Sequence, residues 1–416
     1  MKRVYFTLTL MSLFGGLNAF AQTYTTINGV KYGLMSDNKC IVIGDAGAKG
    51  DITFENEVTI NDHTYPVTGV CGSGDYSDEA KDQKKGFSGN DKITGITFKT
   101  GSQITWIGDH AFKSCKNLNT IKNIPSELND IKSWCFEETG LESVDLSNTK
   151  VTIMKDGVFY NNTSLTSIKL PNKLENFWDN AFYGCTSLNN IEMPSTVVGI
   201  YNHVFDGCTS LTNVKFNDSY TTLGTHVFKN CPLDAVTFPN TLKSIGEYAF
   251  ESTNLKTVDL SNTQITSLPN GSFYDCEQLS DVKLPKELTY IGEKVFYKST
   301  IASITFPPSL QKIDAWAFQN TQLTNVVIPT QCSSIEQGAF SDNANLTTVV
   351  INGLECYLAY QAFCNCSKLT DVYITSKEAP VVERYGFPFD NDPKVHVMKD
   401  FVDIFSGLKT SENYNP

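Results

Sequence analysis

The segment FYGCTSLNNIEMPSTVVGIYNHVF, residues 182–205, contains the pattern that decides the fold. Between its two outer phenylalanines, the apolar positions of the repeat are Cys185, Leu188, Ile191, Met193, Val197 and Ile200. Their spacing fits neither the continuous period of a helix nor the alternation of a strand. The pattern returns about every 23 residues, with phenylalanine at positions 87, 112, 136, 159, 182, 205, 228, 250, 273, 296, 318, 340 and 363. A fixed period of this length is typical of a solenoid.

The consensus of the repeat, L-x-x-I-x-L-P-x-x-L-x-x-I-x-x-x-A-F-x-x-C/N, predicts a strand and a tight turn in each coil. In residues 165–170, Ile168 and Leu170 point inward, while Lys169 points outward. The following proline lacks a donor for the ladder and ends the strand. A short polar residue before A-F, such as Asp179, is typical of a helix N-cap, so we expect a single capped helical turn there.

The repeated phenylalanines are expected to pack between the two faces of each coil, where they close the turn. These structural positions are Phe112, Phe136, Phe159, Phe182, Phe205, Phe228, Phe250, Phe273, Phe296, Phe318, Phe340 and Phe363. Stacked coils bury one continuous core, so a chain of 416 residues need not divide into globular domains.

The composition argues against two classes of partner. The formal net charge is −12, and no basic stripe is visible. Proteins bind nucleic acids and anionic membrane surfaces largely through Lys and Arg side chains that neutralise phosphates. We therefore expect neither nucleic acid nor a membrane surface as a partner.

Residues 1–21 are predicted to be a secretory signal peptide. Lys2 and Arg3 precede an apolar run over residues 4–14, and Ala19-Phe20-Ala21 forms an A-x-A cleavage site. An uncleaved anchor is the alternative, but the run is too short for a comfortable membrane span. The sequence thus predicts export to the cell surface, the medium or the periplasm, without membrane insertion after signal cleavage.

The remaining chain divides into two caps and the repeats. Residues 22–86 alternate apolar and polar residues around turn signals such as Asn28-Gly29, and predict an N-terminal β cap that ends in a charged loop. A separate binding domain is the alternative. About thirteen coils follow over residues 87–375. Residues 376–416 leave the repeat and are expected to form a C-terminal cap and tail.

The tandem repeat resembles the BspA-like leucine-rich repeats, which carry A-F followed by Cys or Asn three residues later. The flanking stretches YPVTGV (65–70) and ITSKEAPVVERYGF (374–387) are also similar to that family. The resemblance implies a leucine-rich-repeat solenoid, horseshoe-like but rich in β-structure, that coils in a right-handed sense around one concave parallel sheet. It also implies a surface or secreted protein of a host-associated bacterium, with a role in adhesion and no catalytic residues.

The twelve cysteines favour a structural interpretation. Six lie at one repeat position, where asparagine replaces them in other coils, as expected of a buried packing column of free thiols. Cys185, Cys208 and Cys231 fall on consecutive coils, so one pair could be close enough to form a bridge. Cys40 and Cys71 in the cap are the strongest candidates if any disulfide forms.

Metal binding and catalysis find little support. No pair of closely spaced C-x-x-C motifs suggests zinc. His203 and His226 lie on adjacent coils, but aromatic residues share their column, which favours a structural ring over a metal pair. No nucleophile elbow, P-loop, dinucleotide fingerprint or calcium loop is present. We expect no enzyme activity, no metal and no cofactor.

The outward strand positions carry the candidate binding residues. The first five alternate in charge and are expected to pair across strands, which would set register and solubility: Lys122, Asp145, Lys169, Glu192 and Lys215. Toward the C-terminus, Val327, Val350 and Tyr373 predict an exposed apolar strip on the concave face. Its polar flank is Asn325, Thr348 and Asp371. A partner site has this character, although the C-terminal cap folding over the strip is the alternative.

These observations favour a non-enzymatic adhesion protein that binds other proteins, such as host matrix proteins or bacterial surface proteins, through many weak contacts on a rigid repeat surface. Capture of glycans or peptides for nutrition is the alternative.

Overall fold

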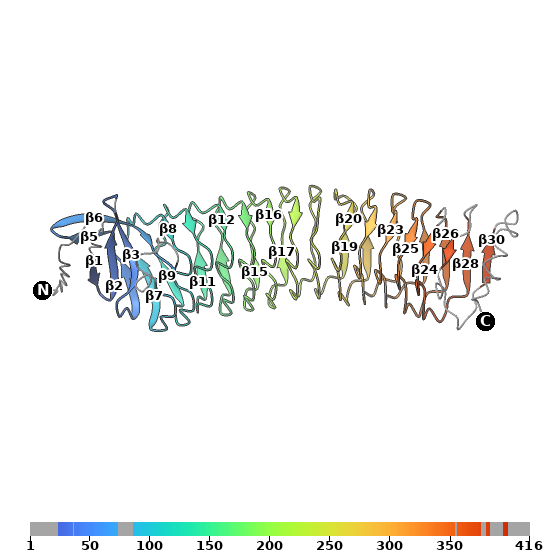
Figure 1. Cartoon of the computed structure of the whole chain (residues 1–416), viewed down its shortest axis with the longest axis horizontal. Coiled ribbons are helices and arrows are strands. Elements are labelled where there is room, and N and C mark those ends of the chain that lie inside the picture. The colour runs from blue at the N-terminus through green and yellow to red at the C-terminus, as the bar shows by residue number, and fades with distance from the viewer. Residues whose placement is uncertain are drawn as a thin grey trace, which may run out of the picture. The chain divides into compact units, whose positions relative to one another are not determined.

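A computed structural model describes residues 24–35, 37–73, 86–353, 356–375, 380–382 and 394–397. The chain separates into two compact units; the first ends at Thr196 and the second begins at Val197. The predicted signal peptide, nearly all of the charged loop and most of the predicted C-terminal cap lie outside the described residues. Within each unit the repeats stack as coils of a β-solenoid, so the predicted architecture is confirmed (Figure 1).

The first unit begins with strands that do not follow the repeat. β1 (Tyr24–Ile27) and β2 (Val30–Leu34) form the expected hairpin, and Asn28 at its turn has a φ of 51°. β2 pairs antiparallel with β3 (Cys40–Asp45), and β5 (Glu57–Ile60) pairs antiparallel with β6 (His63–Val70). β3 and β6 then run parallel, so the direction of the later coils is already set in this region.

Most coils contribute a strand from the L-x-x-I-x-L segment, and we call the sheets of these strands the first face. In the first unit they are β4 (Gly50–Phe54), β7 (Ile93–Phe98), β9 (Thr120–Lys122), β11 (Ser143–Asp145), β13 (Ser167–Lys169) and β15 (Asn190–Ile191). In the second unit they are β17 (Asn213–Val214), β19 (Thr257–Asp259), β21 (Asp281–Lys283), β24 (Asn325–Ile328), β26 (Thr348–Ile351), β28 (Asp371–Ile374) and β30 (Lys394–Val397). Although β4 and β30 lie outside the repeat, they join the same sheets.

A second strand in most coils forms a second face, which the sequence did not indicate. In the first unit these strands are β8 (Trp106–Ile107), β10 (Asp130–Ile131), β12 (Ile153–Met154) and β14 (Asn176–Phe177). In the second unit they are β16 (Gly199–Ile200), β18 (Thr222–Leu223), β20 (Ser267–Leu268), β22 (Tyr290–Ile291), β23 (Lys312–Ile313), β25 (Ser334–Ile335), β27 (Tyr357–Leu358) and β29 (Val381–Val382). Two-residue strands are too short to leave an alternating pattern.

The expected helical turn before each phenylalanine is a tight turn, and the described residues contain no helix. The residue two positions before phenylalanine has a positive φ, such as 55° at His110 and 57° at Trp134. This left-handed conformation cannot continue a right-handed helix. The expected capping residue bonds to the following coil instead, since Asn270 Oδ1 accepts a hydrogen bond from the backbone N–H of Glu293 at 3.0 Å.

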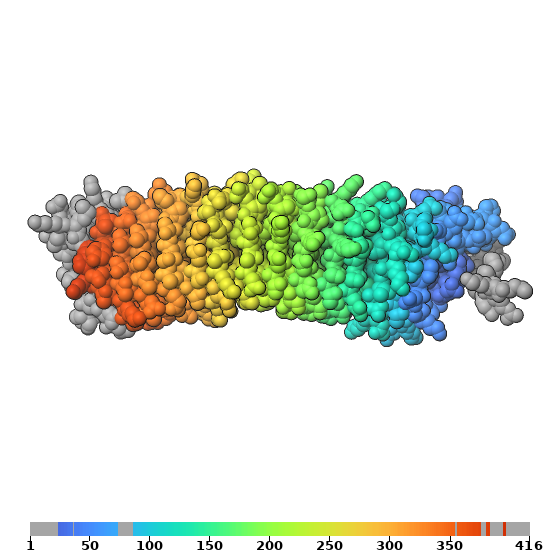
Figure 2. Space-filling view, turned by 180° about the vertical axis from the view of Figure 1, so that it is seen from behind, coloured from blue at the N-terminus to red at the C-terminus, as the bar shows by residue number. Residues whose placement is uncertain are grey.

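The repeated phenylalanines stack ring on ring inside the coils, as predicted. Centroids of successive rings are 5.3 Å apart for Phe159 and Phe182 in the first unit, and 5.2 Å apart for Phe318 and Phe340 in the second. These rings are fully buried. Successive coils form successive bands of colour over the second unit in Figure 2. Each ring therefore fills the space between its neighbours in the preceding and following coils.

The cysteines of the repeated column serve as hydrogen-bond donors. The thiols of Cys115, Cys185 and Cys276 donate to the carbonyl groups of Phe87, Phe159 and Phe250 at 3.0–3.1 Å. Where asparagine replaces cysteine, the amide makes the same bond: Asn162 Nδ2 donates to the carbonyl oxygen of Phe136 at 2.7 Å.

None of the twelve cysteines, all of which the structure describes, forms a disulfide, and this includes Cys40 and Cys71 in the cap. Burial raises the pKa of the Cys115 thiol to about 12 and that of Cys276 to about 11, which keeps both protonated as donors. The column therefore matches the packing interpretation, and none of its members is bridged.

Candidate functional site

The apolar strip predicted near the C-terminus lies on one continuous sheet of the first face. Val327, Val350 and Tyr373 are directly opposite one another on β24, β26 and β28, which lie side by side in Figure 1. Val327 is 49% exposed and Tyr373 is 40% exposed, while Val350 between them is half-buried. Exposed apolar side chains in register across a sheet form a surface that water solvates poorly.

The strip continues onto β30, which the sequence analysis had assigned to the cap. Tyr373 is opposite His396, and the centroids of their rings are 4.4 Å apart. Asp371 is opposite Lys394, and the His396 Nε2 atom lies 2.8 Å from Asp371 Oδ1. This contact lowers the pKa of the Asp371 carboxyl group. We call this surface the β24–β30 patch, made of Asn325, Val327, Thr348, Val350, Asp371, Tyr373, Lys394 and His396.

The alternative was that the C-terminal cap folds over the strip. Of the described parts of that region, β30 lies beside β28 in the same sheet, and β29 lies beside β27 on the second face. Sequence reasoning missed Lys394 and His396 because Pro388 and Pro393 interrupt the repeat just before them. The alternation in Lys394–Val397, with valine at every second position, is the signal that could have found this strand.

The alternating charges predicted on the first face pair only in part as expected. Lys169 Nζ lies 2.8 Å from Asp145 Oδ2, and the hydrogen bonds from Lys169 and Ser147 lower the pKa of Asp145 to about 2. Lys122 does not follow the expected order, because it lies 3.6 Å from Asp51 on β4. Glu192 and Lys215 are exposed in their respective units. A further pair of this kind, Asp259 with Lys283 at 2.9 Å, occurs in the second unit.

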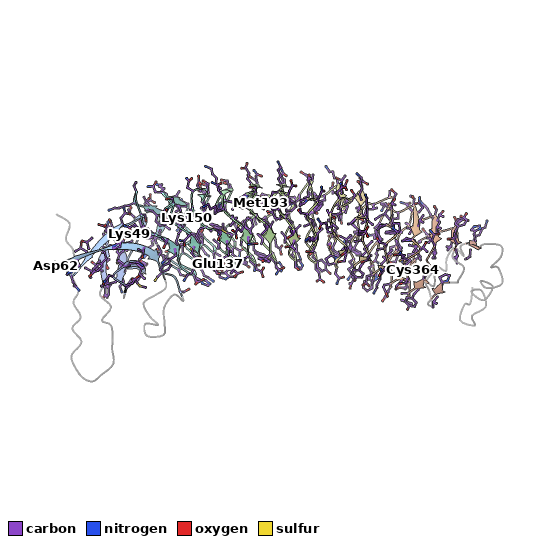
Figure 3. The ribbon with its side chains drawn as sticks, turned by 90° about the horizontal axis from the view of Figure 1, so that it is seen from above. Lys49, Asp62, Glu137, Lys150, Met193 and Cys364 are labelled. Carbon is purple, nitrogen blue, oxygen red and sulfur yellow. The ribbon has the colours of Figure 1, made fainter. Side chains whose placement is uncertain are left out.

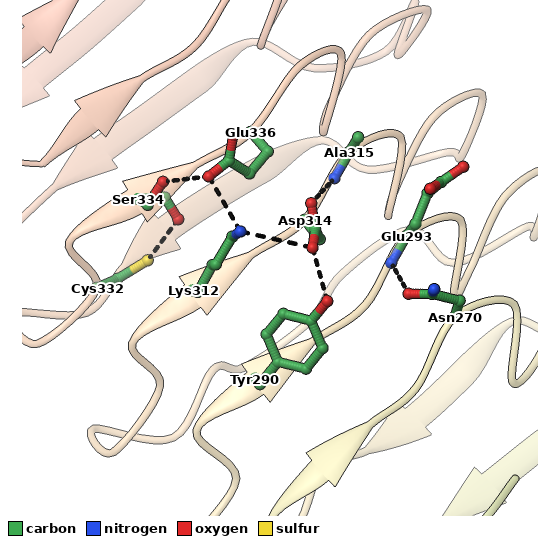
Figure 4. Close-up of polar contacts among 9 residues, drawn as sticks. All are labelled: Asn270, Tyr290, Glu293, Lys312, Asp314, Ala315, Cys332, Ser334 and Glu336. Carbon is green, nitrogen blue, oxygen red and sulfur yellow. Dashed lines mark hydrogen bonds and ion pairs between the residues drawn. The ribbon is translucent and has the colours of Figure 1, made fainter. Parts of the chain in front are cut away.

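A polar network crosses the second face of the second unit (Figure 4). The Tyr290 hydroxyl donates to Asp314 at 2.6 Å, and Lys312 Nζ lies 3.6 Å from Asp314 and 3.2 Å from Glu336. Burial and the bond to Asp314 raise the pKa of Tyr290, so its hydroxyl remains a donor. Because each of these groups already has a partner, the network ties β22, β23 and β25 together and leaves little capacity for a ligand.

The two adjacent histidines form a stack in the second unit. The ring centroids of His203 and His226 are 4.7 Å apart, and His203 Nδ1 lies 3.0 Å from Asp206 Oδ2. Tyr248 stacks on the other side of His226 at 5.2 Å. In the part of the chain that the structure describes, no group of three or more His, Cys, Asp or Glu residues is arranged to hold a metal ion. The histidines therefore belong to a column of stacked rings.

Each unit has an open pocket on its described surface. The first unit has a pocket of about 430 Å³ near Trp106, lined also by Met35, Ile41 and Glu127. The second unit has a cleft of about 410 Å³ between residues 281–286 and 303–308. Both volumes lie in the range of ligand pockets, about 300–1,000 Å³.

Two further residues lie apart from these candidate sites. Met193, labelled in Figure 3, is only half-buried at the end of its strand segment, and Glu137 is buried, with its carboxylate 2.9 Å from Lys113 Nζ. The residues described here include no helix of the length and hydrophobicity needed to cross a bilayer.

Both the repeat sequence and the fold of this chain have counterparts among known proteins. The sequence profile of the BspA type leucine rich repeat region (6 copies) matches residues 83–211, 198–322 and 266–388. No curated protein matches the chain in sequence. The fold is similar to that of a leucine-rich repeat protein from Bacteroides ovatus ATCC 8483, with 20% identity, a TM-score of 0.61, and coverage of 90% of this chain and 99% of that chain. It is also similar to the pneumococcal vaccine antigen PcpA, with 18% identity, a TM-score of 0.52, and coverage of 92% and 96%.

Proposed function

Because the chain belongs to the BspA type leucine-rich repeat family, we propose that it is a non-catalytic binding protein that recognises protein partners through the β24–β30 patch. The observation that carries the proposal is the register of Val327, Val350 and Tyr373. Three apolar or aromatic side chains follow one another across adjacent strands on a face that elsewhere carries charges.

The composition of the patch suits a protein partner. Aromatic residues are enriched in protein interfaces, where a central apolar area is surrounded by a polar rim. Tyr373 is held by its ring contact with His396, so little side-chain freedom is lost when a partner covers it. On the polar side, Asp371 and Lys394 offer one charge of each sign. The patch therefore combines an apolar centre with groups that can fix the orientation of a partner.

The test compares two double variants of the full chain. Val327→Ser/Tyr373→Ser removes the apolar part of the patch. Val198→Ser/Tyr201→Ser is the matched control, since Val198 is 43% exposed and Tyr201 is 47% exposed at another surface of the same unit. Binding is measured on immobilised extracellular-matrix proteins and on a glycan array. We expect the patch variant to lose binding to a matrix protein by about tenfold or more, and the control to retain it.

Other outcomes would redirect the proposal. Equal loss in both double variants would contradict a role for the patch. Selective binding to glycans, without binding to matrix proteins, would favour glycan capture for nutrition.

The proposal also places the protein outside the cytoplasm, at the cell surface or secreted, on the basis of the predicted signal peptide at residues 1–21. N-terminal sequencing of the mature protein tests cleavage before Gln22.

A further inference from the structure

The first face of the second unit is interrupted between β21 and β24. Residues 303–306 occupy the position of a strand between β21 and β24, but they form none. No backbone hydrogen bond joins residues 303–306 to residues 281–284 or 325–328, all of which the structure describes. By comparison, β24 and β26 pair through four successive residues. Unpaired backbone groups in an extended segment retain their capacity to bind another strand.

The edge of β21 that faces this coil is also open. On its other side, the Lys283 carbonyl oxygen accepts a hydrogen bond from the Leu260 N–H at 2.9 Å, and the Asp281 N–H donates to Lys256. In a parallel ladder, alternate residues direct their backbone groups to opposite neighbours. The N–H and C=O groups of Val282 and Leu284 therefore face the interrupted coil, where no backbone partner is present among the described residues.

The interrupted segment ends in a phenylalanine. Phe306 takes the position that Leu284 or Ile328 occupies in neighbouring coils, and it packs edge-on against Phe318 with centroids 5.5 Å apart. Phe238 takes the same position in an earlier coil and packs edge-on against Phe250 at 5.5 Å. That coil also lacks a strand and makes only an isolated bridge at Ala235. In the first unit, Phe54 and Phe98 take this position in β4 and β7, which pair through both residues, so a ring here does not by itself open the ladder. In these two coils of the second unit, the ring packs edge-on against the phenylalanine column, needs more room than an aliphatic chain, and accompanies the loss of the strand.

The gap that results is the cleft of about 410 Å³ between residues 281–286 and 303–308. Its apolar wall includes Val282, Leu284 and Phe306, and Ile304 is half-buried there, whereas Val326 at the equivalent position of the next coil is fully buried. Asp281 and Lys286 stand exposed at its rim. The cleft thus combines open backbone donors and acceptors with an apolar wall.

We infer that this cleft binds an extended peptide segment of a partner protein, which adds a strand where the ladder of the first face is interrupted. Main-chain hydrogen bonds to Val282, Leu284 and residues 303–306 supply the affinity, and apolar side chains at alternate positions of the peptide contact Ile304 and Phe306. This mode of recognition uses the backbone of the ligand and so selects an extended chain over a compact ligand. The site is separate from the β24–β30 patch and does not depend on it.

The probe is a fluorescent peptide with the sequence of residues 345–352, NLTTVVIN. This segment contains β26, which pairs in parallel with a strand on each side, so its sequence suits this ladder. Since β26 is paired on both sides within the folded chain, a second copy cannot present it, and the peptide represents an exposed segment of another protein. We expect saturable binding to the full chain below about 1 mM by fluorescence polarisation. Absence of saturable binding would overturn the inference.

A second peptide carries N-methyl groups at alternate backbone amides and keeps every side chain. Because N-methylation removes backbone donors, we expect this peptide to bind about tenfold more weakly or worse. Equal affinity for both peptides would mean that the side chains alone are recognised, and the strand-addition inference would be wrong.

The decisive variant is Phe306→Leu, which restores an aliphatic residue of the kind used in regular coils. We expect residues 281–284 and 303–306 to pair, the amides of Val282, Leu284 and Ile304 to exchange more slowly with deuterium, and peptide affinity to fall by about tenfold or more. Val327→Ser/Tyr373→Ser is the control and should leave peptide binding unchanged. Unchanged affinity in Phe306→Leu, or slow exchange of these amides already in the wild-type protein, would overturn the inference.

Discussion

Two neighbouring stretches of the second unit share one repeat and differ in one structural respect. From β24 to β30, each coil pairs with the next through four residues of the first face, whereas residues 303–306 pair with neither neighbour. Both stretches keep the phenylalanine column intact, with Phe318 and Phe340 stacked at 5.2 Å. The core of a coil can therefore remain regular while its surface strand is lost.

The largest effect is expected from a substitution in the phenylalanine column, which the two stretches share. Phe340→Ala removes a fully buried ring that stacks on Phe318 and on Phe363 at 5.2 Å each. A cavity of this kind costs about 3–5 kcal/mol. Urea denaturation followed by circular dichroism should show a lower midpoint than for wild type. A change below about 1 kcal/mol would contradict a column in which each ring supports the next.

A smaller loss is expected at the donor column of the same coil. Asn343 is buried and its Nδ2 donates to the carbonyl groups of Phe318 and Phe340, both at 2.8 Å. Asn343→Ala leaves these acceptors unsatisfied and should cost about 1–3 kcal/mol. Asn343→Cys is the matched variant, since cysteine fills this position in other coils, and it should recover part of the loss. Equal denaturation midpoints for both variants would argue against a donor role.

A still smaller change in stability is expected from substitutions in the interrupted coils. Phe238→Leu alters the strand segment that has only an isolated bridge, and a change of this type usually costs less than about 1.5 kcal/mol. We expect slower amide exchange at Val236 and Thr237, because the segment can now join the ladder. Leu284→Phe is the reverse variant and should speed exchange in β21. If amide exchange changes in neither variant, phenylalanine at this position does not cause the interruption.

The smallest effect concerns the exposed charges of the regular ladder. Hydrogen bonds from Ser261 and Lys283 lower the pKa of Asp259 to about 2, below its unfolded value of about 3.9. The stabilisation is therefore complete above about pH 4 and is lost as the pH falls toward about 2. Because the pair is exposed, the change is small. Carboxylate titration by NMR should give a midpoint of about 2 for Asp259 and a higher one in Lys283→Met; a wild-type midpoint near 4 would contradict the pairing.

The period of phenylalanine was sufficient to predict the solenoid, because one buried ring in each coil imposes a fixed spacing on the chain. The helical turn was predicted wrongly, because a short polar residue before A-F also suits a turn that enters a left-handed conformation. Only the φ values, such as 55° at His203 and at Trp316, distinguish the two. The second face depends on pairing between coils, which a single coil of sequence does not reveal.

The candidate sites were predicted to different degrees. The alternation of Val327, Val350 and Tyr373 could be followed from one repeat to the next, and their shared register agrees with it. The contribution of His396 was missed because it depends on a strand beyond the repeat. The cleft was also missed, since phenylalanine and leucine both count as inward apolar residues in a pattern, although they differ in volume.

The bond from each buried cysteine or asparagine to a phenylalanine carbonyl in the preceding coil has an evolutionary consequence. A coil with cysteine or asparagine at this position supplies one donor to its predecessor, as Cys276 does toward Phe250, whereas Thr253 donates to Phe250 of its own coil. A gene that gains or loses one whole repeat of the cysteine or asparagine type therefore rejoins with matching partners at the new junction. Between the cleft and the β24–β30 patch, such an event would change the separation in steps of about 4.8 Å. Recombination could thus adjust the distance between two binding surfaces while leaving each surface intact.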